Sequence, residues 1–101
     1  MSRLGNILNA LASYEKRTVA TGITATKRGK VVTVSFVGPN TTSTSVRTTF
    51  GTLPTGWWPA ADVFVGNISG NAGYVGVNAS GEVQAFRPTL GRVDATVTYV
   101  V

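Results

Sequence analysis

Cysteine and histidine are absent from this 101-residue chain, and acidic residues number only four. Without cysteine there is neither a disulfide framework nor a thiolate metal site. Paired carboxylates of the kind that hydrolyse glycosides are not apparent, because the four acids lie far apart in sequence. Phosphate-binding loops, the Gly-x-Ser-x-Gly nucleophile motif and metal-ligand spacings are also missing. These absences predict a protein that is not an enzyme and that uses no metal or cofactor.

Long apolar runs are missing as well. No stretch approaches the roughly 20 residues of a membrane-spanning helix, and the N-terminus lacks the features of a signal peptide. We therefore expect no membrane insertion. The hydrophobic fraction of 43% is too high for a disordered chain, and the length fits one small domain.

The net charge of +5 is unevenly distributed along the chain. Residues 1–30 hold six basic residues against one acid, whereas residues 31–101 hold three of each. The densest basic segment, Lys27-Arg28-Gly29-Lys30, is typical of a solvated hairpin turn, although it could also ease docking onto an acidic partner. Nucleic-acid binding needs aromatic residues within a basic face, and here the aromatics lie mostly in the neutral part. We expect no nucleic-acid partner.

Residues 3–14 have the pattern of a short amphipathic helix capped by Ser2. Such a helix is marginal alone in water, so its apolar stripe must be buried. The stripe packs either on its own domain or, as we favour, in a short coiled coil that joins several copies. The candidate oligomerisation residues are Leu4, Ile7, Leu8 and Leu11. This interpretation divides the chain into a shaft stub at 1–16 and a head domain at 17–101.

Period-two alternation predicts at least six short strands after Arg17. The runs lie at residues 19–25, 32–36, 46–50, 63–65, 74–77, 82–86 and 93–101. Gly38-Pro39-Asn40 is expected to end the second run. Asn78 and Gly81 predict a type I turn with a left-handed bulge residue between the fifth and sixth runs. Short strands separated by turns indicate an all-β sandwich or barrel.

Several motifs occur in a fixed order: Gly-Lys-Val-Val-x-Val-x-Phe at 29–36, Leu-Pro-x-Gly-aromatic-x-Pro at 53–59, a Gly-x-Val hairpin at 74–86, and a terminal strand. This combination resembles the C-terminal head domains of phage tail-fibre and baseplate receptor-binding proteins. The resemblance implies a jelly-roll-like β-sandwich that assembles as a homotrimer. It also implies a place in the virion tail after assembly in the host cytoplasm. The implied partners are host cell-wall polysaccharide and other tail or baseplate proteins.

The positions that match the loop and hairpin regions of such heads are the candidate saccharide-binding residues. They are Trp57, Trp58, Tyr74, Gln84, Phe86 and Arg87. Aromatic faces can stack on sugar rings, but adjacent side chains point opposite ways, so at least one tryptophan should pack on the core or on a neighbouring subunit. Tyr74, Phe86 and Arg87 could instead fill the core or pair across strands.

Two functions therefore remain open. The first is a tail-tip protein that binds host saccharide, with an affinity per site of about millimolar to micromolar and avidity from three sites. Because the head is neutral overall, this binding should tolerate salt. The alternative is a structural virion protein, a decoration or connector trimer without a ligand.

Overall fold

The computed structural model describes residues 15–66 and 73–101, and within them the protein is all-β with no helix. The expected helix over 3–14 and its apolar stripe lie outside the described residues. Eight strands are present: β1 (Glu15–Ala20), β2 (Ile23–Arg28), β3 (Val31–Asn40), β4 (Thr48–Thr52), β5 (Val63–Gly66), β6 (Tyr74–Val77), β7 (Glu82–Phe86) and β8 (Arg92–Val100). The expectation of at least six strands is confirmed.

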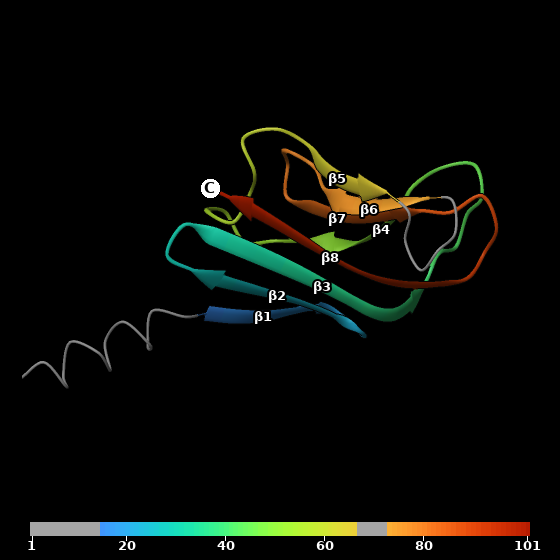
Figure 1. The fold of residues 1–101 in the computed structure, drawn as a ribbon, viewed down its shortest axis with the longest axis horizontal. Coiled ribbons are helices and arrows are strands. Elements are labelled where there is room, and N and C mark those ends of the chain that lie inside the picture. Colours follow the sequence, from blue (N-terminus) through green and yellow to red (C-terminus); the bar gives the residue numbers. More distant parts are fainter. Residues whose placement is uncertain (1–14, 67–72) are drawn as a thin grey trace, which may run out of the picture.

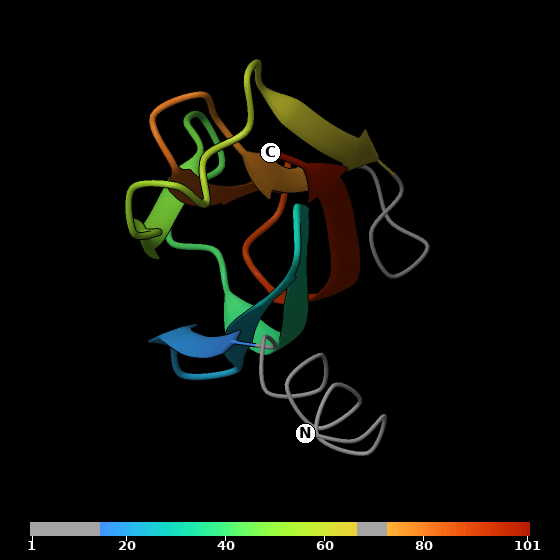
Figure 2. The same ribbon diagram turned by 90° about the vertical axis from the view of Figure 1, so that its left-hand side faces the viewer.

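The strands form two four-stranded antiparallel sheets, which lie as two layers in Figure 1. Sheet A has the order β1-β2-β3-β8, and sheet B has the order β4-β7-β6-β5. Figure 2 shows the same layers from one end. In sheet B, β5, β6 and β7 follow one another as antiparallel neighbours, and β7 comes to lie beside β4, the strand that precedes them, which is a Greek key. In sheet A, β1–β3 form a simple meander and β8 closes the sheet.

One hydrophobic core lies between the sheets, built by alternation along each strand. Every second residue of a strand points inward, so a short run of alternating apolar and polar residues gives each strand one buried face. Sheet A contributes Ile23, Ala25, Val32, Val34, Phe36, Val93, Val97 and Tyr99, and sheet B contributes Val75, Val77, Val83 and Ala85. The loop after β4 adds Leu53 and Trp57.

The single run expected over residues 19–25 is wrong, because the structure folds it into two strands. β1 and β2 pair antiparallel around a turn at Thr21-Gly22, where Gly22 has a φ of +82°. A side chain at Gly22 would place its Cβ 2.5 Å from the Val37 carbonyl oxygen. The two residues are also joined by a hydrogen bond from the Val37 N–H to the Gly22 carbonyl. The apolar alternation passes through the turn and conceals it.

Gly38-Pro39-Asn40 does not end its strand, in contrast to the expectation. β3 continues to Asn40, which pairs with Arg92 after a register shift beyond Val37. Proline has no N–H to give to a ladder, and Gly38 has a φ of +87°, so the two residues form a bulge within the sheet.

The β6–β7 hairpin is confirmed at the expected residues. The Gly81 N–H donates to the Asn78 carbonyl, and Gly81 has a φ of +78°. The Asn78 side-chain oxygen accepts hydrogen bonds from the backbone N–H groups of Ser80 and Glu82. Asparagine and glycine therefore fix this turn, as their turn preferences predict.

Candidate functional site

The outer face of sheet B gathers three of the candidate saccharide-binding residues. Val75, Val77, Val83 and Ala85 point into the core, so the alternate positions face outward. Tyr74 of β6 pairs directly with Phe86 of β7, and Gln84 precedes Phe86 by two residues in β7, so it lies on the same face. The hairpin register thus brings Tyr74, Gln84 and Phe86 together, each of them partly exposed.

Phe64 of β5 joins Tyr74 and Phe86 to form a row of three rings across neighbouring strands. The Tyr74 and Phe86 rings stack with centroids 5.5 Å apart and an interplanar angle of 28°. Phe64 meets Tyr74 edge to face, also at 5.5 Å. These offset and edge-to-face arrangements are the favoured geometries for aromatic pairs. We refer to Phe64, Tyr74 and Phe86 as the aromatic shelf.

Gly76 leaves the space that Phe64 needs. It is buried in β6 opposite Phe64 in the register, and a Cβ at Gly76 would come within 2.4 Å of the Phe64 ring. On the other side, Gly76 pairs with Gln84, whose Nε2 donates to the Thr49 hydroxyl over 3.0 Å. The Gln84 Oε1 is buried and has no hydrogen-bond partner within the described part of the chain.

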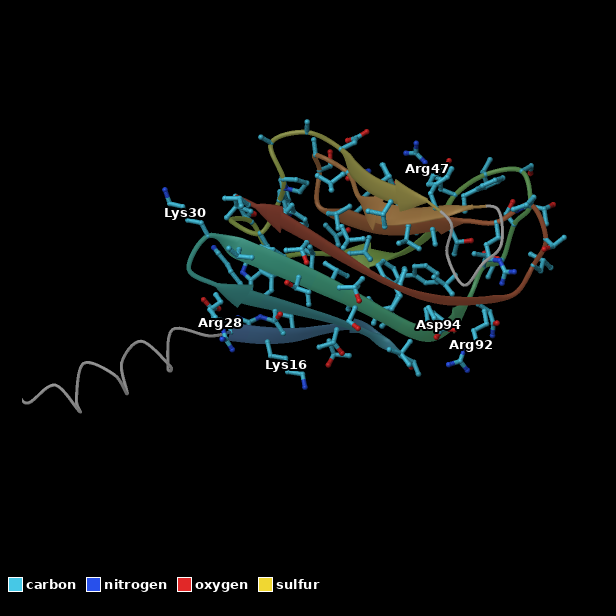
Figure 3. The ribbon with its side chains drawn as sticks, in the orientation of Figure 1. Lys16, Arg28, Lys30, Arg47, Arg92 and Asp94 are labelled. Atoms are coloured by element: carbon cyan, nitrogen blue, oxygen red, sulfur yellow. The ribbon has the colours of Figure 1, made fainter. Side chains whose placement is uncertain are left out.

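Arg47, just before β4, extends across this face. Its Cζ lies 4.3 Å from the Phe64 ring centroid and 5.4 Å from that of Tyr74. Its Nε donates to the Tyr74 hydroxyl over 3.2 Å. Figure 3 shows the guanidinium projecting beyond sheet B on the side away from sheet A. A cation over aromatic faces is attracted by their quadrupoles, so the shelf holds the Arg47 side chain in place.

The two tryptophans lie away from the shelf. Trp57 is 4% exposed within the core, where its carbonyl accepts a hydrogen bond from the Tyr99 hydroxyl. Trp58 is 38% exposed, and its Nε1 donates to the Leu53 carbonyl over 2.7 Å. Its ring rests on Gly81, where an added Cβ would come 2.1 Å from the indole. The expectation that one tryptophan packs internally is confirmed, and Trp58 is the exposed one.

Trp58 and the shelf sit at opposite ends of the β6–β7 hairpin. Trp58 covers the turn, while Tyr74 and Phe86 lie at the open end. Tyr74 is four residues from Asn78, where the turn begins, which is a rise of roughly 13 Å in an extended strand. One monosaccharide cannot contact both places, so the six candidate residues do not form one site.

Arg87 is also separate from the shelf, because it continues the inward series of β7. It is 8% exposed, its Nη1 donates to the Arg92 carbonyl, and its Nε has no partner within the described residues. Gly91 makes room for it, since a Cβ there would come 2.5 Å from Nη1. This placement favours a packing role at the end of β7 over contact with a ligand.

Arg47 and Phe64 were missed by the sequence reasoning. Their signal is weak: Phe64 is the outward member of a Val-Phe-Val run, and Arg47 follows a Ser/Thr-rich loop. What makes them part of a site is the pairing of β5 with β6 and of β4 with β7. The β4–β7 pairing joins segments far apart in the chain, and the β5–β6 register that sets Phe64 beside Tyr74 cannot be read from local alternation.

The other charged groups mostly lie elsewhere. Figure 3 shows Lys16, Arg28 and Lys30 at the end of sheet A where β2 turns into β3, far from Arg47. An open depression of about 400 Å³ lies there, lined by Thr26, Arg28, Val31 and Thr33. At the other end, the Arg92 Nε lies 2.7 Å from Asp94, and this hydrogen bond and attraction raise the pKa of Arg92.

In the described ranges, no group of three or more acidic, histidine or cysteine residues is placed to hold a metal ion. Over the same ranges, no helix has the length and apolarity needed to cross a membrane. Scanning the chain against protein-family models gives no match, and a search of curated proteins gives none either.

Proposed function

We propose that this protein is a phage tail protein of the receptor-binding or tail-fibre-tip type that binds host cell-surface saccharide through the outer face of sheet B. The observation that carries the proposal is the aromatic shelf with Arg47 above it and Gln84 beside it. Contiguous apolar patches on a protein surface, when rimmed by polar groups, often mark ligand or protein interaction sites. The ordered motifs of the sequence supply the tail-protein part of the proposal.

The chemistry of the shelf suits a sugar. The C–H groups of a pyranose can pack against ring carbons of Phe64 or Phe86, while its hydroxyls meet polar groups at the margin. The Tyr74 hydroxyl, the Gln84 Nε2 group and the Arg47 guanidinium supply such groups within one face. Few convergent polar groups around an apolar surface are the usual composition of a small-ligand site.

The finer architecture, a jelly-roll-like trimeric head, belongs to this proposal. Eight strands in two four-stranded antiparallel sheets, with a Greek key in sheet B, support a relation to jelly rolls. A jelly roll has two Greek keys, and here β1–β3 form a meander instead. Trimer formation rests on the apolar stripe of residues 3–14 and on the resemblance. In the virion, such a trimer would join other tail or baseplate proteins.

The alternative is a structural virion protein without a ligand, a decoration or connector trimer. Internal packing of Trp57 and Arg87 favours it, because two of the six candidate binding residues serve the fold instead. The shelf could then be a contact with another virion protein.

Screening the full chain on a glycan array and on intact bacterial cells distinguishes the two. Tyr74→Ala should weaken binding at least tenfold while the protein still unfolds cooperatively. Val37→Ala, at a 61% exposed position on sheet A, is the matched control and should bind as the wild type does. If no saccharide or cell is bound at any concentration tested, the structural alternative holds; binding unaffected by Tyr74→Ala would place the site elsewhere.

A further inference from the structure

Arg47 is a cation without an anion. The chain has four acids, and all of them lie within the described residues. Each has a partner other than Arg47: Glu15 contacts Arg17, Asp94 contacts Arg92, Glu82 accepts from the Asn78 side chain, and Asp62 accepts from the Ala79 N–H. The positive charge above the shelf is therefore uncompensated within the described protein.

Arg47 is also held in a fixed position. Its Nε is bonded to Tyr74, and its Cζ lies over two rings. Neither Nη forms a hydrogen bond within the part of the chain that the structure describes. A guanidinium fixed by Nε and by ring faces presents its outer N–H groups as a ready-made fork, so little side-chain entropy is lost when an anion binds.

The contrast with Arg17 supports a special role. Arg17 also lies over an aromatic ring, with Cζ 5.6 Å from the Trp57 centroid, but its Nη2 is 3.4 Å from Glu15. The guanidinium of each arginine lies over an aromatic ring. Of the two, Arg17 also contacts a carboxylate, and Arg47 does not.

Resting on the proposed function, we propose that Arg47 makes this site selective for acidic saccharides, in which a carboxylate or phosphodiester adjoins the sugar ring. The apolar face of the sugar packs on the aromatic shelf, and the anion accepts hydrogen bonds from the free Nη groups of Arg47. Two-pronged pairs of this kind are stronger and more directional than neutral hydrogen bonds. Carboxylate and phosphate share this chemistry, and both suit the planar fork.

The proposal also sets the salt dependence. One ion pair releases about one counterion, so affinity should fall only a few-fold between about 50 and 200 mM salt. A basic groove with several phosphate contacts would lose about a thousandfold or more over the same range. The formal charges of residues 31–101 sum to zero, which is consistent with a weak dependence of affinity on salt concentration.

The test uses the full chain and an array with matched pairs. Galacturonate oligomers are compared with their methyl esters, and methyl phosphodiesters of hexose 1-phosphates with the corresponding methyl hexosides. Binding of at least one acidic probe should exceed its neutral match about tenfold or more. Arg47→Gln should remove that preference and keep the weak binding of the neutral match, and Arg47→Lys should keep part of it. Which acidic probe binds identifies the source of the anion.

Arg92→Gln is the charge-matched control, since it removes one exposed cation from sheet A and should preserve the preference. Unchanged melting temperatures would separate binding from folding. Wild-type protein that binds neutral and acidic probes equally, or an Arg47→Gln variant that keeps the preference, overturns the inference and leaves saccharide binding intact. Wild-type protein that binds no saccharide on the array overturns the proposed function itself.

Discussion

Trp57 and Trp58 are neighbours in sequence with different surroundings. Trp57 fills the core between the sheets, whereas Trp58 lies on the surface against Gly81 with one hydrogen bond to Leu53. Removing a buried aromatic side chain costs about 3–5 kcal/mol, and removing a surface one with a single hydrogen bond costs about 1 kcal/mol.

We therefore expect Trp57→Ala to lower the free energy of unfolding far more than Trp58→Ala. Urea titrations followed by circular dichroism would measure both, with Val37→Ala as an exposed control. Equal losses for the two variants would contradict the placement of Trp57 in the core.

Tyr99 links the closing strand to the Trp57 loop through its hydroxyl, and burial raises the pKa of this phenol to about 12. The ordinary value is about 10, so the folded state favours the neutral phenol. The associated stability, about 3 kcal/mol, is complete below pH 10 and is lost as pH rises through 12.

Wild-type protein should therefore lose stability between pH 10 and 12 more steeply than Tyr99→Phe, which has no proton to release. Urea unfolding at several pH values would show the difference. All other groups are common to the two proteins, so the difference between their profiles reports on Tyr99. Parallel pH profiles for the two would rule out a buried neutral phenol at Tyr99.

At the scale of elements, the β6–β7 hairpin depends on its turn glycine for two separate reasons. Gly81 has a positive φ, and the Trp58 ring occupies the place of its missing side chain. Gly29, in the turn between β2 and β3, also has a positive φ of +62° but nothing within 4 Å of a built Cβ. Substitutions at Gly29 therefore measure backbone strain alone, whereas substitutions at Gly81 measure backbone strain together with the steric conflict with Trp58.

Gly29→Ala should cost about 1 kcal/mol from backbone strain alone. Gly81→Ala should cost more, because Trp58 must also move, and Gly81→Val should cost more again. Thermal melts of the three variants would rank them. If Gly81→Ala were no worse than Gly29→Ala, the packing of Trp58 on Gly81 would be incorrect.

At the scale of the whole molecule, the expected homotrimer stays a prediction. Its basis is the stripe Leu4, Ile7, Leu8 and Leu11, which a short isolated helix cannot leave in water. Light scattering coupled to gel filtration should give a mass about three times that of the 10.5 kDa chain at micromolar concentration. Leu8→Asp should shift the mass towards that of the monomer, and Lys30→Asp, at an exposed position of the head domain, is a charge-changing control. A wild-type monomer would refute the trimer.

Local chemistry determined much of this protein. Alternation predicted an all-β chain, and Asn78 with Gly81 predicted the β6–β7 hairpin and with it the pairing of Tyr74 with Phe86. These features need only neighbours in sequence, because a tight turn fixes the register of the strands that it joins. The same reasoning failed at Gly22, where apolar alternation continued through a turn.

Only the tertiary structure decided the rest. Which tryptophan is buried depends on how the loop after β4 meets β8, and Arg87 is buried because its guanidinium packs against Gly91 and donates to the Arg92 carbonyl. Arg47 reaches Tyr74 because β4 pairs with β7, a segment distant along the chain, and Phe64 reaches it through the β5–β6 register, which local alternation does not fix. Such pairings are selected by the burial of the whole core rather than by any single stretch, so the site on sheet B exists only once both sheets have formed.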